Sequence, residues 1–336
     1  MLNTGSHHAP HIRAAQSSRG VMWDAIIALS FLYALAAYYY GARAIALGLG
    51  SALVCTLCDI LTTRMAGRKI NVRDFSAPVT GLILPLMMPA SIPYYIVVIA
   101  GVFAITVAKA PFGGTGNNVF NPAAAGFSFV AFCFGNVLFT YPPPAMEMPL
   151  WGAIEFTAPV SPARVMMLGG TPGYDALDMI LGNYPGPMGA TNILILIACL
   201  LYLVLKGTVR WSLPVSFFGA VALVALVFPR GAAARLASVG FELATGLVFF
   251  GGIFLLGDPV TTPRRETARI AFAFCAGIMV MLFRHFGNME EQITYALLLM
   301  NASVWLFDMA GERIAGRTRR KRHEAGNADG RNKASP

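Results

Sequence analysis

The stretch Pro78-Val-Thr-Gly-Leu-Ile-Leu84 is echoed 165 residues further on by Leu243-Ala-Thr-Gly-Leu-Val-Phe249. Both stretches are apolar and both carry a glycine, which is tolerated in membrane helices more often than in soluble ones. The first and sixth apolar segments of the chain begin 168 residues apart, and the second and seventh begin 167 residues apart. A chance recurrence of Thr-Gly-Leu is the alternative, but the agreement of three spacings favours an internal repeat.

The composition around this repeat is that of a membrane protein. The chain has 336 residues, of which 56% are hydrophobic and 12% are charged. Soluble domains carry about 25% charged residues. Half of that charge cannot cover a globular surface, so the composition excludes a water-soluble single-domain enzyme, a disordered chain and a coiled coil.

Ten segments are candidates for membrane helices, each of which needs about 20 mostly apolar residues. They are 22–40, 44–62, 76–91, 93–110, 123–140, 190–206, 211–228, 239–257, 268–286 and 291–308. Five helices in each half is an odd number, so the second half is inverted relative to the first. Inverted repeats with broken helices are typical of transporters whose sites lie at the repeat interface. The predicted fold is an all-α polytopic membrane protein of about ten transmembrane helices in two inverted five-helix repeats.

The basic residues predict the orientation of these helices. With a cytoplasmic N-terminus, 20 of the 25 Lys and Arg residues fall in cytoplasmic segments, as the positive-inside rule requires. We therefore expect both termini in the cytoplasm (N-in/C-in). The basic run 317–323 is then expected to bind anionic membrane lipid, which explains the net charge of +9 without a nucleic-acid partner.

Five parts make up the expected organisation. They are a cytoplasmic N-terminal segment (1–21), a first membrane repeat (22–140), a periplasmic loop (141–189), a second membrane repeat (190–308) and a basic cytoplasmic tail (309–336). The periplasmic loop is far longer than the connections usual in compact domains, which indicates a functional role.

Two polar connections lie on the predicted cytoplasmic side. In the first, 109–123, Asn118 and Asn121 follow several glycines. An amide both donates and accepts hydrogen bonds and so suits the edge of a heterocycle, although Asn also caps helices. The second connection, 257–265, holds Asp258. Its carboxylate suits the imide N–H or the hydroxyls of a ligand, and a solvated helix cap is the alternative.

Two acidic residues, Asp59 and Glu242, fall inside predicted membrane helices. Charges in the membrane are costly and commonly functional. These carboxylates are candidates for an ion or proton relay, and an interfacial position is the alternative.

The centre of the periplasmic loop reads Leu168-Gly-Gly-Thr-Pro172. Glycines before Thr171 place its hydroxyl on flexible backbone, which a modifying enzyme requires. An ordinary Gly-Pro turn is the alternative.

Taken together, these residues resemble the RnfD/NqrB family, the membrane flavin subunits of ion-motive electron-transport complexes. The stretches that carry the resemblance are Ala9–Arg13, Val79–Leu82, Phe112–Gly114, Asn121–Ala123, Trp211–Phe217, Asp258–Thr261 and Leu298–Ala302. They extend over nearly the whole chain, and the Phe-Gly-Gly, Asn-Pro-Ala and Asp-Pro-Val-Thr elements are specific in combination.

The resemblance implies a flavoprotein. Family members carry FMN in a phosphoester with a Thr of a Ser/Thr-Gly-Ala-Thr motif, and Thr171 occupies that place, with Leu168 and Gly170 departing from the motif. Thr191, in a literal Gly-Ala-Thr, is the rival. A non-covalent riboflavin near the cytoplasmic side is also implied, and Asn118, Asn121 and Asp258 are its candidate ligands.

The implied function is that of an integral subunit of an Rnf-type complex in a bacterial inner membrane, coupling electron transfer between ferredoxin and NAD to Na⁺ or H⁺ translocation. The implied partners are the other membrane, iron–sulfur and flavin subunits, and a flavin transferase. The sequence has no FAD-binding fold, NAD-binding glycine fingerprint or iron–sulfur cysteine set, so we expect no activity from the chain alone. The alternatives are a stand-alone inverted-repeat channel or transporter without a redox cofactor and a structural scaffold.

Overall fold

Helices are the only regular elements in the part of the chain that the structure, a computed structural model, describes: residues 18–69, 74–152, 154–230 and 234–332. Most of the predicted segment 1–21, including the stretch Ala9–Arg13, lies outside these residues.

The first half of the chain forms five apolar helices before the long connection. They are α1 (Ser18–Tyr40), α2 (Ala42–Met65), α3 (Ser76–Leu86), α4 (Tyr94–Thr106) and α5 (Pro122–Leu138), with the short 3-10 turn η1 (Ala110–Phe112) after α4. The shortness of α3 follows from Pro85 in its last turn and Pro89 just beyond it, because proline supplies no N–H donor to the helix.

The connection and the second half follow. The connection contains α6 (Pro162–Met167) and α7 (Ala176–Leu181), and the second half contains α8 (Ile193–Leu205), α9 (Ser212–Val227), α10 (Arg235–Ala244), α11 (Val248–Phe250), the π-helix η2 (Gly251–Leu255), α12 (Glu266–Phe286) and α13 (Ile293–Asn332).

Each of the ten predicted membrane ranges contains a helix, but their lengths differ. Within the described residues, five helices are long and apolar enough to cross a membrane: α1, α2, α4 extended to Phe112, α12 and α13 as far as Ala315. A sixth span results if α10 and the following α11–η2 segment, which are bent by 66°, count as one. The remaining apolar helices α3, α5, α8 and α9 have 10–17 residues. The polytopic all-helical class is confirmed, whereas the number of ten stays a prediction.

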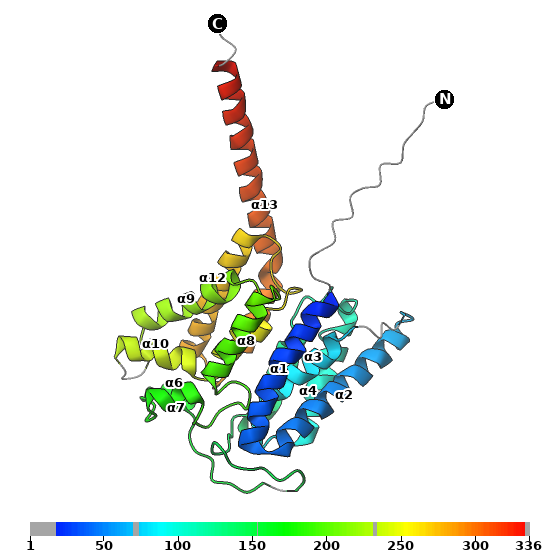
Figure 1. Cartoon of the computed structure of the whole chain (residues 1–336), viewed down its shortest axis with the longest axis vertical. Helices are drawn as coiled ribbons and strands as arrows, with labels where there is room; N and C mark the ends of the chain where they lie inside the picture. Colours follow the sequence, from blue (N-terminus) through cyan, green and yellow to red (C-terminus); the bar gives the residue numbers. More distant parts are fainter. Residues whose placement is uncertain (1–17, 70–73, 153, 231–233, 333–336) are drawn as a thin grey trace.

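The two halves lie side by side. In Figure 1 the helices α1 to α4 lie to the right of α9, α10 and α12, and α8 lies next to α1. Contacts join α1 to α8 and α5 to α13 across the middle. Within the halves, α2 packs on α4 as α9 packs on α12, and α4 packs on α5 as α12 packs on α13.

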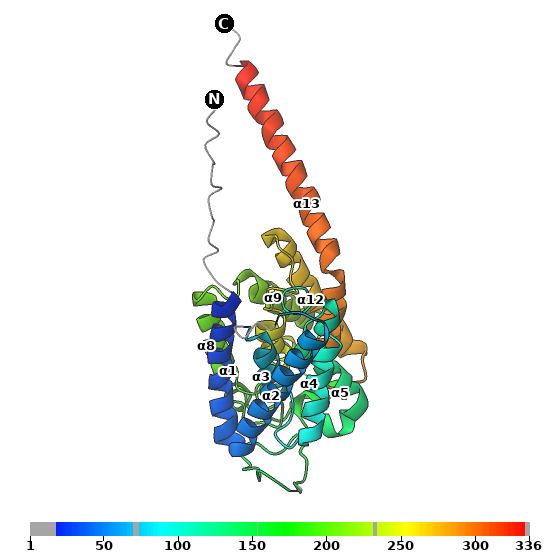
Figure 2. The same cartoon turned by 90° about the vertical axis from the view of Figure 1, so that its right-hand side faces the viewer.

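The start of α1 and the far end of α13 lie at the same end of the molecule (Figures 1 and 2), and α13 extends well beyond the other helices. The connection that carries α6 and α7 lies at the opposite end. Below, these are called the terminal end and the loop end.

Two glycines of the repeated stretches explain why the stretches matter for the fold. A Cβ on Gly81 would lie 2.5 Å from the Ala52 Cα, so glycine allows α3 to pack directly on the backbone of α2. Gly246 has a φ of +67° and lies at the break between α10 and α11, a conformation that glycine adopts without steric cost. Gly81 therefore allows α3 to pack closely on α2, and Gly246 allows the chain to break between α10 and α11.

Candidate functional site

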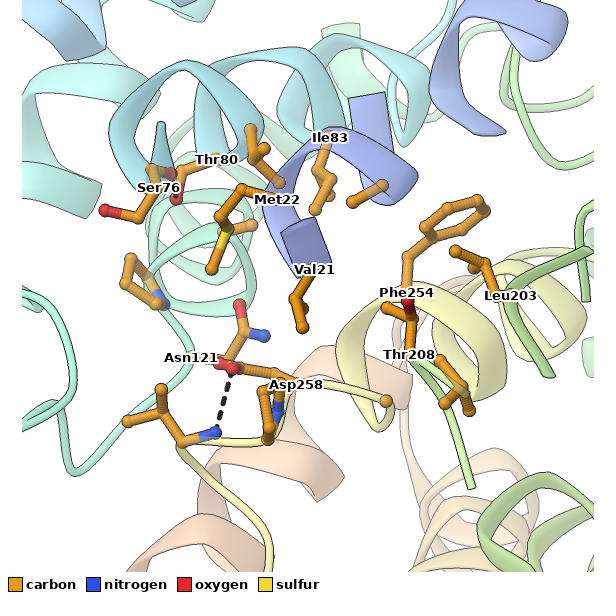
Figure 3. Close-up of a pocket in the computed structure, with 18 of the residues that line it drawn as sticks. Val21, Met22, Ser76, Thr80, Ile83, Asn121, Leu203, Thr208, Phe254 and Asp258 are labelled. Atoms are coloured by element: carbon orange, nitrogen blue, oxygen red, sulfur yellow. Dashed lines mark hydrogen bonds between the residues drawn. The ribbon is translucent and has the colours of Figure 1, made fainter. Parts of the chain in front are cut away.

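A cavity of about 90 Å³ lies between the two halves near the terminal end of the bundle. Its walls come from α1, α3 and the start of α5 on one side, and from the end of α8, η2 and residues 257–260 on the other. Figure 3 shows Asn121 and Asp258 among the residues that line it, with Thr80 on α3 and Phe254 in η2. Two of the three predicted riboflavin ligands thus face one cavity.

Both the side-chain amide and the backbone N–H of Asn121 form hydrogen bonds. It caps α5, where its Oδ1 accepts a hydrogen bond from the Ala124 N–H at 3.1 Å, and its Nδ2 donates to the Leu255 carbonyl at 3.2 Å. Oriented to satisfy its neighbours, the Asn301 amide accepts from the Asn121 backbone N–H at 3.0 Å. The alternative considered for this residue, a helix cap, is therefore confirmed, and the side chain also links the two halves.

The Asp258 carboxylate forms hydrogen bonds within its own loop. Its carboxylate accepts hydrogen bonds from the Val260 N–H at 3.1 Å and from the Thr261 hydroxyl at 3.4 Å. Burial raises the pKa of Asp258 above its ordinary value, and these two hydrogen bonds oppose the shift. Because a carboxylate has about four lone-pair positions, Asp258 keeps acceptor capacity for a ligand in the cavity.

Asn118 lies in a neighbouring space. It lines an open hollow of about 610 Å³ together with Trp305 and the loop that follows Asp258. Pro259 and Val260 line both this hollow and the cavity. The Asn118 Oδ1 is buried, and no described residue forms a hydrogen bond with it.

The two spaces adjoin at Pro259 and Val260 and offer groups that suit parts of a flavin. Small-molecule sites occupy about 300–1,000 Å³, a size that the hollow reaches and the cavity alone does not. The orphan oxygen of Asn118 suits the imide N–H of the ring, and the exposed indole of Trp305 offers a stacking surface. Hydroxyls of Ser76, Thr80 and Thr208 line the adjoining cavity and suit a polyol chain.

A buried lysine lies beside the cavity, at the start of the first polar connection, where the sequence predicted no role for it. Lys109 is 1% exposed and pairs with Asp59 at 3.0 Å, and its ammonium group also donates to the Ser76 hydroxyl at 2.7 Å. Asp74 lies nearby. Its partial burial favours a higher pKa, but hydrogen bonds from Thr115 and Ser76 outweigh this and lower the pKa. Asp59 therefore has a cation as its partner, which the spacing of the sequence did not indicate.

The predicted attachment residue lies elsewhere, toward the loop end. Thr171 is exposed in the turn between α6 and α7. It follows Gly169, whose φ is +82°, and Gly170, whose N–H donates to the Val165 carbonyl at 3.0 Å. Its rival Thr191 is only 2% exposed, because it packs beneath Gly182 and Gly186 at the start of α8.

Fold and cavity define a class: a polytopic helical membrane protein with a cavity, lined by several polar side chains, between the two halves of the chain. Comparison with known proteins identifies the family within this class. The chain belongs to the NQR2, RnfD, RnfE family, whose model matches residues 6–315.

Relatives match over nearly their whole length. The chain is 30% identical to the D subunit of the Na(+)-translocating ferredoxin:NAD(+) oxidoreductase complex of Acetobacterium woodii, over 96% of the chain and 98% of the relative. It is 28% identical to the D subunit of the proton-translocating ferredoxin:NAD(+) oxidoreductase complex of Clostridium ljungdahlii, over 93% and 96%. The D subunit of an ion-translocating oxidoreductase complex of Halorhodospira halophila is also 28% identical, over 92% and 95%.

Proposed function

We propose that this protein is the flavin-carrying membrane subunit of an Rnf-type complex, in which electron transfer between ferredoxin and NAD is coupled to translocation of Na⁺ or H⁺. The observation that carries the proposal is the end-to-end match to the corresponding subunits of ferredoxin:NAD(+) oxidoreductase complexes. The chain acts within that assembly, with the other membrane, iron–sulfur and flavin subunits as partners.

The proposal includes the orientation and symmetry of the bundle in a bacterial inner membrane. The terminal end faces the cytoplasm, as the distribution of basic residues predicts, and ten helical segments form two inverted halves. The contact between α2 and α4 in the first half corresponds to the contact between α9 and α12 in the second half, which supports the repeat. In this orientation Thr171 lies in the periplasm and the cavity opens toward the cytoplasm.

FMN is proposed to be joined to the Thr171 hydroxyl through a phosphoester, and riboflavin to bind at Asn118, Asn121 and Asp258. Flavins supply one- and two-electron redox chemistry. The chain's own residues position them: Thr171 presents an exposed hydroxyl to a flavin transferase, Asn118 offers an acceptor, and Asp258 offers a carboxylate.

Fluorescence of the denatured protein tests the attachment. After co-expression with a flavin transferase, we expect a fluorescent band on a denaturing gel, and we expect Thr171→Ala to abolish it, because the hydroxyl oxygen forms the ester. Thr157→Ala, at another exposed threonine of the same connection, is the matched control and should keep the full signal.

Two results would contradict this assignment. If Thr171→Ala stays fluorescent and Thr191→Ala does not, the attachment residue is Thr191. If the wild-type band is dark in the presence of the transferase, the chain carries no covalent flavin.

A further inference from the structure

Two consecutive carboxylates are buried at the loop end, in the short turn between α12 and α13. Glu290 is 6% exposed and Glu291 is 1% exposed. Each has one bonded oxygen: Glu290 Oε1 accepts from the Ser161 hydroxyl, and Glu291 Oε2 accepts from the Leu247 N–H at 2.9 Å. Among the residues that the structure describes, none forms a hydrogen bond with Glu290 Oε2 or Glu291 Oε1. A buried acceptor without a partner is costly, so these two oxygens require an explanation.

The two arginines near this pair, Arg230 and Arg284, already form ion pairs with another carboxylate, that of Glu242. Glu242 is fully buried, and its carboxylate accepts from Arg230 at 2.8 and 3.2 Å and from Arg284 at 2.6 Å. Arg284 also donates to the backbone carbonyls of Glu242 and Thr245. Two largely buried guanidinium groups thus lie beside three buried carboxylates, and the third guanidinium nearby, that of Arg164, is exposed to solvent. One negative charge is in excess if all three are ionised, and an uncompensated buried charge is unfavourable.

The groups that face the pair come from every neighbouring element. They are Cys133 in α5, Tyr141 after α5, Ser161 and Arg164 of the α6 region, Tyr184 before α8, Arg230 and Glu242 of the α10 region, and Arg284 in α12. Arg164 is exposed and acts on Glu290 from a distance. None of the others supplies a hydrogen bond to the two free oxygens.

The two carboxylates differ in their access to water. Glu290 lines an open hollow of about 810 Å³ at the loop end, together with Asn136, Thr140 and Arg164. Glu291 faces the interior, where its carboxylate contacts Gly246 at the break between α10 and α11. The pair therefore connects an accessible space with the interior of the bundle.

We propose that Glu290 and Glu291 form a proton-binding site that exchanges one proton with water in the hollow. Hydronium gives its proton to a free carboxylate oxygen, which leaves water and a neutral carboxylic acid. Release to water reverses this step. The neutral acid removes the excess charge of the cluster and converts one orphan acceptor into a donor.

A proton fits this pair better than a metal ion does. Calcium takes six to eight oxygen ligands and magnesium six in near-ideal octahedral geometry. In the described part of the chain no group of three or more His, Cys, Asp or Glu side chains is arranged to hold a metal. Burial raises the pKa of Glu290 to about 8, with Glu291 adding to the rise and Ser161 opposing it. The site therefore gains its proton near neutral pH and loses it as the pH rises through about 8.

Infrared difference spectroscopy of the full-length protein in liposomes tests the proposal. The pH is raised from about 6 to about 10, a range that lies above the ordinary titration of carboxylates at about pH 4, so that ordinary carboxylates stay ionised throughout. We expect the carbonyl band of one protonated carboxylic acid to disappear with a midpoint near 8. Labelling glutamate with carbon-13 should shift this band, which identifies it in the wild-type chain without any substitution.

Variants assign the band to the pair. Glu290→Gln should remove it, and Glu291→Gln should lower its midpoint or remove it. Glu155→Gln, at an exposed glutamate of the long connection, should leave both the band and its midpoint unchanged.

Three results would overturn the proposal. They are a wild-type spectrum without a titrating glutamate band, a band that survives both substitutions, and a band that falls when Na⁺ is added at constant pH. The last result would make the pair a sodium site. The measurement reports on the carboxylates of this chain and does not depend on flavin attachment, so it is independent of the proposed function.

Discussion

At the scale of single residues, Gly246 connects the broken helix to the buried carboxylates. It lies in the left-handed region at φ +67°, and a side chain there would run into the carboxylate of Glu291. We expect Gly246→Ala to lower the free energy of unfolding by about 1 to 3 kcal/mol, because alanine is strained in this conformation. The midpoint of thermal unfolding of the detergent-solubilised protein measures the effect.

Gly240 provides a matched control for this substitution. It lies inside α10, its φ is not positive, and a Cβ there meets nothing within 4 Å. Gly240→Ala is expected to be neutral or to stabilise by about 0.4 to 1 kcal/mol. Equal midpoints for the two variants would show that the break at Gly246 imposes no conformational requirement.

Residue types and local spacing predicted part of the candidate site. Asn121 and Asp258 were predicted from their side-chain chemistry, and both line the cavity between the halves. Glu290 and Glu291 were not predicted, because they lie at the predicted start of a membrane helix and no motif includes them. Their burial arises from packing against Ser161 and Leu247, contacts that local sequence does not show.

At the scale of elements, the first turn of α5 depends on a single side chain. Asn121→Ala removes both the cap on the Ala124 N–H and the bond to the Leu255 carbonyl. Loss of a cap costs about 1 kcal/mol, so we expect faster amide hydrogen exchange at the start of α5. Because the second bond crosses to η2, exchange in the segment Gly251–Leu255 should rise as well.

The cap of α8 is the comparison. Asn192→Ala removes the cap on the Ile195 N–H and a bond to the Leu181 carbonyl, neither of which reaches η2. Exchange should then rise at the start of α8 and stay unchanged in η2. If both variants affect η2 equally, Asn121 has no particular role in joining the halves.

Helix positions were predictable because apolar runs are the strongest signal of membrane proteins. Helix lengths were harder to predict than helix positions. Pro85 and Pro89 predict that the range 76–91 is short and broken, and α3 ends at Leu86, after 11 residues that rise only about 17 Å at 1.5 Å per residue. The bend of 66° after Ala244 likewise follows from a local backbone conformation that hydropathy does not report.

At the scale of the whole molecule, the orientation can be tested by labelling from one side. In a background without the five native cysteines, Thr157→Cys and Ala66→Cys place exposed thiols in the long connection and in the connection after α2. We expect a membrane-impermeant maleimide to label Thr157→Cys in cells with a permeable outer membrane, and Ala66→Cys only after the inner membrane is opened. Labelling of both from one side would contradict the orientation.

The division into two halves was predicted from three similar spacings, one of them that of a repeated motif. What the sequence could not indicate is how the halves meet: α1 against α8, α5 against α13, and a cavity where η2 approaches α5. Such contacts depend on shape and on hydrogen bonds between distant segments, so they require coordinates.

The amide of Asn121, which ties α5 to the Leu255 carbonyl, has a consequence for inhibitor design. A single hydrogen bond of this kind contributes about 0.5 to 1.5 kcal/mol net, which is small beside the affinity of a compound that fills a pocket. A compound with its own N–H donor, directed at the Leu255 carbonyl, would replace this bond and widen the cavity from within. Medicinal chemistry against this family could therefore begin from a donor-bearing fragment that separates the two halves rather than from a flavin mimic.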